Sequence, residues 1–149
     1  SLERALLCDM RIAGESAKMM LPEIKHGVVP DSGGTARLFQ IAGHGLIADL
    51  ALTGRTMDAD EALRHGVVSR VVPDEELDAV SRRVCAEIAA NPPFAVKMFR
   101  RTLGRIAHPL VTRTMQEESM AMTTIYETED YAEMKAARSE GRDPSYRGR

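Results

Sequence analysis

The stretch from Pro22 to Gly34 constrains the fold of this chain more than any other part of the sequence. It contains two prolines, Pro22 and Pro30, and three glycines. Proline cannot continue a helix interior, and glycine adopts backbone conformations that other residues avoid. No regular helix can run through this stretch. The sequence therefore predicts a shaped loop with ordered structure on either side.

The segments around this loop alternate between helical and extended patterns. Apolar residues recur at helical spacing before the loop and in several blocks after it. Asp58, with Glu61 three residues later, resembles a capping box and marks a helix start, while Gly43 interrupts the helix that follows the loop. The expected helices are 1–8, 35–53, 59–64 and 74–88, and the expected strands are 9–14, 17–21 and 67–72. Residues 1–90 are thus predicted to form a mixed α/β part.

From Asn91 onward the pattern is entirely helical. The Asn91-Pro92-Pro93 sequence is typical of a hinge, because Asn91 can cap a helix and prolines are tolerated in its first turn. One apolar stripe precedes Pro109 and a second follows it. A last helix, 129–138, is expected to stop at the Gly-Arg-Asp-Pro sequence of 141–144. Residues 91–149 are thus predicted to form a separate helical region.

Charge and composition exclude several classes of function. The 149 residues carry a formal net charge of -2 and no tryptophan, which argues against a nucleic-acid partner. No apolar run approaches the roughly 18 residues of a membrane span, so we expect no membrane partner. The four histidines lack the spacing of a helical metal site, and no metal is predicted; they are His26, His44, His65 and His108.

The two cysteines indicate the compartment. Cys8 and Cys85 lie far apart and form no C-x-x-C pair. The beginning of the chain also lacks the basic, apolar and small-residue regions of a secretory signal. We therefore interpret both cysteines as reduced thiols of a cytoplasmic protein rather than as a disulfide.

Two glutamates stand in positions that suggest a function for their carboxylates. Glu3 lies inside an apolar helix start, and Glu23 follows Pro22 at the beginning of the shaped loop. Taken singly, each has the simpler interpretation of a solvated surface residue. Gly33-Gly34-Thr35 precedes a helix and could offer backbone N–H groups to an anion, although a plain tight turn explains the same residues.

Short motifs surround these glutamates and continue along the chain. They are Glu-Arg-Ala-Leu-Leu-Cys-Asp at 3–9, Leu-Pro-Glu-Ile-Lys-His-Gly at 21–27 and Pro-Asp-Ser-Gly-Gly-Thr-Ala-Arg-Leu at 30–38. Leu-Thr-Gly-Arg at 52–55, Gly-Val-Val at 66–68, the hinge at 91–93 and the terminal Tyr-Arg-Gly-Arg follow in order. Together they resemble the signature of the enoyl-CoA hydratase/isomerase (crotonase) family. The resemblance implies the second half of a crotonase-like ββα spiral core, followed by a helical C-terminal oligomerisation region.

The family pattern implies a catalytic role for both glutamates. Glu3 and Glu23 match the acid–base pair of members that add water to a 2-enoyl-CoA and form a 3-hydroxyacyl-CoA. In this interpretation Glu3 holds and activates the water, and Glu23 delivers a proton to C2. Two carboxylates close together should titrate as a coupled pair. Coenzyme A is part of the substrate, and no other cofactor is expected.

The same pattern implies a set of substrate-binding positions and leaves their details open. The positions that match the family's substrate-binding loop are Pro22, Pro30, Gly33 and Gly34. Near the C-terminus, Arg138 or Arg142 could replace a lysine that relatives use against the CoA phosphates, although both also fit an exposed basic tail. The terminal helices suggest a homotrimer or hexamer, and Met115, Met120 and Met122 would suit an adaptable interface or close over their own core.

Asp31 keeps a second reaction open. It stands where many hydratases carry glycine. A third carboxylate at this position could move a proton between C2 and C4 of the acyl chain. In that case the protein would be a double-bond isomerase. Alternatively, Asp31 simply caps the following helix. A third hypothesis is a non-catalytic fragment that serves subunit assembly.

The beginning of the chain suggests a longer natural protein. The sequence opens with Ser1, and a helical spacing starts at once, so we expect the natural chain to begin earlier. The family stabilises the enolate oxygen with two backbone N–H groups that precede the segment matched here. Losing one such donor commonly costs about 10² to 10³ in rate. We therefore expect this chain alone to be nearly inactive toward crotonyl-CoA.

Overall fold

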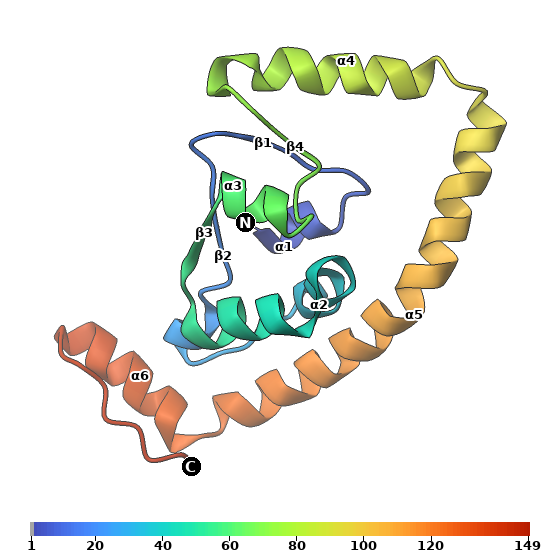
Figure 1. Ribbon diagram of the computed structural model, residues 1–149. Helices are drawn as coiled ribbons and strands as arrows, with labels where there is room; N and C mark the ends of the chain where they lie inside the picture. Colours follow the sequence, from blue (N-terminus) through green and yellow to red (C-terminus); the bar gives the residue numbers. More distant parts are fainter. Residues whose placement is uncertain (1) are drawn as a thin grey trace.

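The computed structural model describes residues 2–149, so Ser1, the first residue of the expected helix 1–8, lies outside the described residues. The helices are α1 (Leu2–Leu6), α2 (Gly34–Thr53), α3 (Ala59–Arg64), α4 (Leu77–Ala89), α5 (Pro93–Tyr126) and α6 (Glu129–Glu140). The strands are β1 (Ile12–Gly14), β2 (Lys18–Met20), β3 (Thr56–Asp58) and β4 (Arg70–Val72), and 3-10 turns form η1 (Glu23–His26) and η2 (Asp74–Glu76). Figure 1 shows α4, α5 and α6 in an arc around the other elements.

Two small sheets tie distant segments together. β1 pairs in parallel with β4, with Ala13 opposite Val71, and β2 pairs antiparallel with β3, with Met19 opposite Met57. A parallel pair requires a crossover, and here everything between the two strands serves as that crossover. The loop after Pro22 and the helix that follows it are therefore enclosed between β1 and β4 along the chain.

The core lies between α1, α2, α3 and the strands. Its members are almost all aliphatic or alanine: Leu2, Leu6, Ala13, Leu21, Leu38, Leu46, Ile47, Leu50, Met57, Ala59, Ala62, Val67 and Val68. Gly43 has non-helical torsions (φ 78°, ψ 175°) and kinks α2, which confirms the predicted break. The kink allows residues on both sides of it, such as Leu38 and Leu50, to reach the same core.

Several predicted boundaries were wrong for identifiable reasons. The first helix ends at Leu6, since Leu7 and Cys8 form i→i−3 bonds to Arg4 and Ala5. The strand predicted over 67–72 is confined to Arg70–Val72, because the N–H of Val67 bonds to Ala62 and its carbonyl accepts from Arg11. β3 was not predicted.

In the hinge, the prolines stand at the beginning of α5 as predicted, but Asn91 does not cap this helix. The side chain of Asn91 donates to the carbonyls of Glu87 (2.9 Å) and Ile88 (3.4 Å). It therefore finishes α4 and does not cap α5, whose first residue is Pro93. The predicted division at residue 91 falls in the turn between these two helices.

α5 is one continuous helix that includes Pro109. The two apolar stripes predicted on either side of this proline thus belong to a single element, which packs against α2. No helix of residues 2–149 is both long enough and apolar enough to cross a bilayer. Cys8 and Cys85 are exposed free thiols, and the cytoplasmic location stays a prediction.

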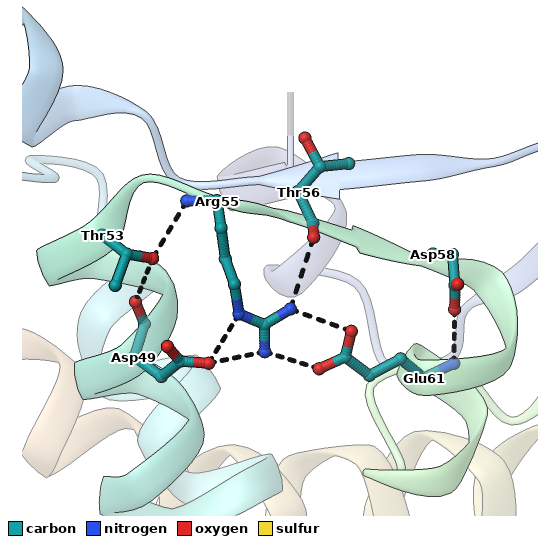
Figure 2. A network of polar contacts seen from close by, with 6 residues as sticks. All are labelled: Asp49, Thr53, Arg55, Thr56, Asp58 and Glu61. Atoms are coloured by element: carbon teal, nitrogen blue, oxygen red, sulfur yellow. Dashed lines mark hydrogen bonds and ion pairs between the residues drawn. The ribbon is translucent and has the colours of Figure 1, made fainter.

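Arg55 joins α2, β3 and α3 through a polar network (Figure 2). Its guanidinium donates to Asp49 at 2.6 Å and forms a bidentate pair with Glu61 at 2.9 and 2.5 Å. The Asp58 side chain accepts from the N–H of Glu61 at 2.8 Å, which confirms the predicted helix cap. Because the Glu61 side chain is bound to Arg55, it does not reach back to complete a capping box.

We predict that Arg55→Lys lowers the Tm by about 1–4 °C at neutral pH, because a lysine cannot bridge both carboxylates with a planar fork. The Arg55 hydrogen bonds lower the pKa of Glu61 below its usual 4.5. The pair thus stabilises the fold above pH 4.5 and loses this effect as the pH falls through the lowered folded pKa. Thermal unfolding at pH 7 and at pH 3 should show the Tm difference shrinking in acid.

Arg64→Lys provides the matched control for this substitution. Arg64 is an exposed arginine on α3 and has no ion pair within the described part of the chain. Its replacement should leave the Tm unchanged at both pH values. Equal Tm changes for both variants would contradict a specific role for Arg55.

Candidate active site

Glu3 is a buried carboxylate at the centre of the candidate site. It lies on α1 with 8% of its surface exposed, between Leu2 and Leu6, which pack into the core on the same helix. Its Oε1 accepts the N–H groups of Ser32 and Gly34, each at 3.3 Å. The short helix thus fixes the side chain from one end and the loop fixes it from the other.

The loop before α2 is shaped to receive this carboxylate. Gly33 has a φ of +79°, a conformation that favours glycine, and it is the residue that precedes α2. At Gly34, a Cβ atom would lie 2.6 Å from Glu3 Oε1 and 2.7 Å from its Cγ. Neither glycine can therefore be replaced without moving its surroundings.

Glu23 lies close enough to Glu3 for its charge to act on the Glu3 carboxylate. It begins η1 directly after Pro22, is half-buried, and its Oε2 has no hydrogen-bond partner within residues 2–149. The turn is held by hydrogen bonds from the N–H of Lys25 to Pro22 and from the N–H of Val28 to Glu23. This oxygen is itself buried, so Glu23 carries a desolvated acceptor that the described residues leave unsatisfied.

The surroundings of Glu3 raise its pKa. Burial is the largest cause, because it disfavours the charged form, and the negative charges of Glu23 and Asp31 act in the same direction. The N–H groups of Ser32 and Gly34 oppose this effect by stabilising the carboxylate. The charge of Glu23 therefore acts on the Glu3 carboxylate.

The remaining predicted positions lie around this pair. Asp31 is exposed, and it accepts a hydrogen bond from the hydroxyl of Ser32 at 3.2 Å rather than capping α2. Pro30 is buried and Pro22 half-buried. A role of these prolines and of Gly33 and Gly34 in binding substrate stays a prediction.

Glu118 is a residue of this region that the sequence analysis missed. It lies on α5, and its Oε2 accepts the N–H of Gly33 at 3.1 Å. The protein's own carboxylates thus occupy the N–H groups that Gly33 and Gly34 could offer to an anion. A signal for Glu118 was present, because it falls between Met115 and Met122 at the helical spacing of an apolar stripe.

The two arginines near the C-terminus differ in their surroundings. Arg142 forms ion pairs with Glu133 and Glu140 and lowers the pKa of Glu133 to about 2. Arg138 instead lines a cavity of about 490 Å³ together with His26 and Lys135. The positive charge of Arg142 is already balanced within the protein.

A comparison with protein families identifies the group to which the chain belongs. The model of the enoyl-CoA hydratase/isomerase family matches residues 2–149. The chain belongs to the enoyl-CoA hydratase/isomerase family. This confirms the family resemblance of the motifs and accounts for the whole described chain.

Individual relatives are similar over nearly all of this chain. A probable enoyl-CoA hydratase of Mycobacterium bovis is 39% identical over 144 residues, which are 97% of this chain and 56% of that protein. A carnitinyl-CoA dehydratase of Salmonella arizonae is 37% identical over 150 residues, 98% of this chain and 58% of that protein. The chain thus spans a little over half the length of these curated relatives.

A solved structure of an enoyl-CoA hydratase/isomerase from Pseudoalteromonas atlantica has the same fold. It aligns with a TM-score of 0.90 at 32% identity and covers 98% of this chain and 59% of the other. The predicted fold class is confirmed: an α/β segment of a crotonase-like core followed by a helical C-terminal region.

We predict that Gly34→Ala displaces the Glu3 carboxylate in this family member. The three atoms nearest to the new methyl group all belong to the side chain of Glu3, which can move, so the fold should survive while the carboxylate turns toward solvent. The pKa of Glu3 should then fall toward 4.5, because burial is the main cause that raises it. An NMR titration of ¹³C-labelled glutamate carboxyls would measure this change.

Gly45→Ala is the matched control on the same helix. A Cβ at Gly45 meets nothing within 4 Å. This variant should leave the pKa of Glu3 unchanged and stabilise α2 by about 0.5–1 kcal/mol. An unchanged Glu3 titration in Gly34→Ala would contradict the described fit.

Proposed function

We propose that the full-length protein hydrates 2-enoyl-CoA to 3-hydroxyacyl-CoA by syn addition of water, with Glu3 and Glu23 as the acid–base pair. The main support is the buried carboxylate of Glu3, which two backbone N–H groups orient and whose pKa the charge of Glu23 helps to raise. A carboxylate of this kind is oriented, partly desolvated and a stronger proton acceptor than a solvated glutamate.

The reaction divides the atoms of one water between two carbons. Glu3 accepts a proton from water while the water oxygen forms a bond to C3. The electrons of the C2–C3 double bond then move toward the thioester carbonyl and give an enolate. Glu23 then gives a proton to C2. The proton held by Glu3 passes to Glu23 before the next turnover, so the net change is the addition of H₂O. Coenzyme A enters as part of the substrate, and no separate cofactor is proposed.

The substrate class is supported by the names of the relatives. One is called a probable enoyl-CoA hydratase and another a carnitinyl-CoA dehydratase, and both names specify a CoA thioester. For the CoA phosphates, Arg138 is the stronger candidate, because it lines the same cavity as His26 and Lys135. Arg142 is engaged by Glu133 and Glu140 and would first have to leave them.

Isomerisation of a 3-enoyl-CoA is the second candidate reaction. Asp31 supports it, because its negative charge contributes to the raised pKa of Glu3. A proton could then move from C4 to C2 through Glu23 or Asp31 without addition of water. A role confined to subunit assembly is the remaining alternative.

We predict that Glu3→Gln in the full-length protein lowers the kcat for hydration of crotonyl-CoA by about 10²- to 10⁴-fold, because an amide cannot accept the proton from water. Hydration is measured by the loss of ultraviolet absorbance from the double bond that is conjugated with the thioester. Isomerisation of a 3-enoyl-CoA is measured in parallel and should persist if Glu23 or Asp31 carries that proton.

Glu15→Gln is the control, because Glu15 is an exposed glutamate before β2. It should retain both activities. If Glu3→Gln hydrates crotonyl-CoA as fast as the wild-type protein, Glu3 is not the base.

We also propose that the full-length protein assembles as a trimer or a hexamer. α5 exposes many large apolar side chains, and their burial in an interface between subunits would be favourable. These side chains are Phe94, Met98, Phe99, Leu103, Ile106, Leu110, Met115 and Met120. Light scattering on the full-length protein should give three or six times the mass of one chain. A monomer would contradict this assembly.

A further inference from the structure

Glu118 is a buried carboxylate to which the proposed reaction gives no role. Only 6% of its surface is exposed, although charged side chains are rarely buried without a partner. Its Oε2 accepts the N–H of Gly33, and its Oε1 has no hydrogen-bond partner in the described part of the chain. A helix far along the sequence thus brings a negative charge to the loop that holds Glu3.

Glu3 and Glu118 bind three successive N–H groups of that loop in alternation. Glu3 accepts from Ser32 and Gly34, and Glu118 accepts from Gly33, which lies between them. The loop is therefore held by two carboxylates from two different helices. Any rotation of the backbone that breaks the bond to Glu118 also turns the neighbouring N–H groups away from Glu3.

α5 limits the movement of the loop in the opposite direction. A Cβ on Gly33 would lie 3.0 Å from Val111 Cγ1 and 3.4 Å from Met115, so the glycine backbone packs directly on this helix. The loop cannot shift toward α5 without a clash, and it cannot shift away without losing the bond to Glu118. The partial positive charge at the beginning of α2 also favours a carboxylate here.

We propose that Glu118 is a positioning residue for Glu3: it fixes the loop at 32–34 in the orientation in which Ser32 and Gly34 donate to the Glu3 carboxylate. This inference rests on the proposed function, in which Glu3 is the base. Through Glu118, the helical C-terminal region takes part in the geometry of the acid–base pair.

The test compares Glu118→Leu with Glu118→Gln in the full-length protein. Leucine cannot accept the Gly33 N–H, so the two N–H groups that lower the pKa of Glu3 turn away while Glu3 stays buried. The kcat for crotonyl-CoA should fall by about 10²-fold with KM nearly unchanged, because a small misplacement of a catalytic group costs this much. The acid limb of the kcat–pH profile should move to higher pH.

Glutamine retains an oxygen that can accept the Gly33 N–H, so Glu118→Gln should restore the kcat and the acid limb nearly to wild-type values. Glu117→Leu and Glu117→Gln are the matched controls, because Glu117 is the neighbouring glutamate on α5 and is exposed. Both should behave as wild type. If Glu118→Leu does not fold, Glu118→Asp replaces it, since its shorter side chain draws the carboxylate away from Gly33.

Two outcomes would overturn the positioning role. One is a fall in kcat without movement of the acid limb, which indicates a structural role only. The other is an equal loss for Glu118→Leu and Glu118→Gln.

An NMR titration of the Glu3 carboxyl separates this inference from the proposed function, because it requires no activity. If the wild-type protein does not hydrate enoyl-CoA but Glu118→Leu raises the pKa of Glu3, the proposed function fails and the positioning role of Glu118 stands. If Glu118→Leu leaves the pKa of Glu3 unchanged, the positioning role is refuted.

Discussion

The structure around the candidate site depends on a carboxylate that is buried against the beginning of a helix. Moving Glu3 out of water disfavours its charged form, and the N–H groups of Ser32 and Gly34 partly compensate. The compensation is available because these N–H groups precede or begin α2 and have no intrahelical partner. The absence of a side chain at Gly34 is equally necessary, since a Cβ there would occupy the position of the carboxylate. Burial, loop shape and the start of α2 are therefore one connected constraint.

The tertiary fold serves this constraint at some distance. The β1–β4 pair joins Ile12–Gly14 to Arg70–Val72, and the core packs α1, α2 and α3 against one another. The Arg55 network then fixes the end of α2 to α3 (Figure 2). α5 closes the loop from the side that α1 leaves open, through Val111, Met115 and Glu118. Each element contributes a contact that local sequence preferences alone do not specify.

The sequence predicted the order of the elements better than their ends. Glycine, proline and the Asp58 cap locate the loop, the kink in α2 and the start of α3, because these residues act through their own backbone. The strand at 67–72 was overextended since the backbone groups of Val67 bind Ala62 and Arg11, which only the folded chain brings near. β3 has three residues, too few for a recognisable pattern.

The candidate site was predictable only through the family motifs. From residue types alone, Glu3 had the interpretation of a surface glutamate, and its burial follows from contacts with residues about 30 positions later. Glu118 was not found, although a glutamate within an apolar helical stripe is a sign of a buried role. Its partner is the backbone N–H of Gly33, and a pattern of side-chain types does not predict a backbone partner.

The bond between Gly33 and Glu118 also has a consequence for the order of folding. It joins residues 85 positions apart, so it can form only after most of this segment has been synthesised and α5 has docked on α2. Contacts of such long range are slow to form, because the intervening chain must first lose its freedom. A nascent chain that ends before Glu118 therefore lacks the bond that holds the loop at 32–34 from the side of α5. We therefore expect the backbone around the Glu3 carboxylate to reach its final geometry only after α5 has docked.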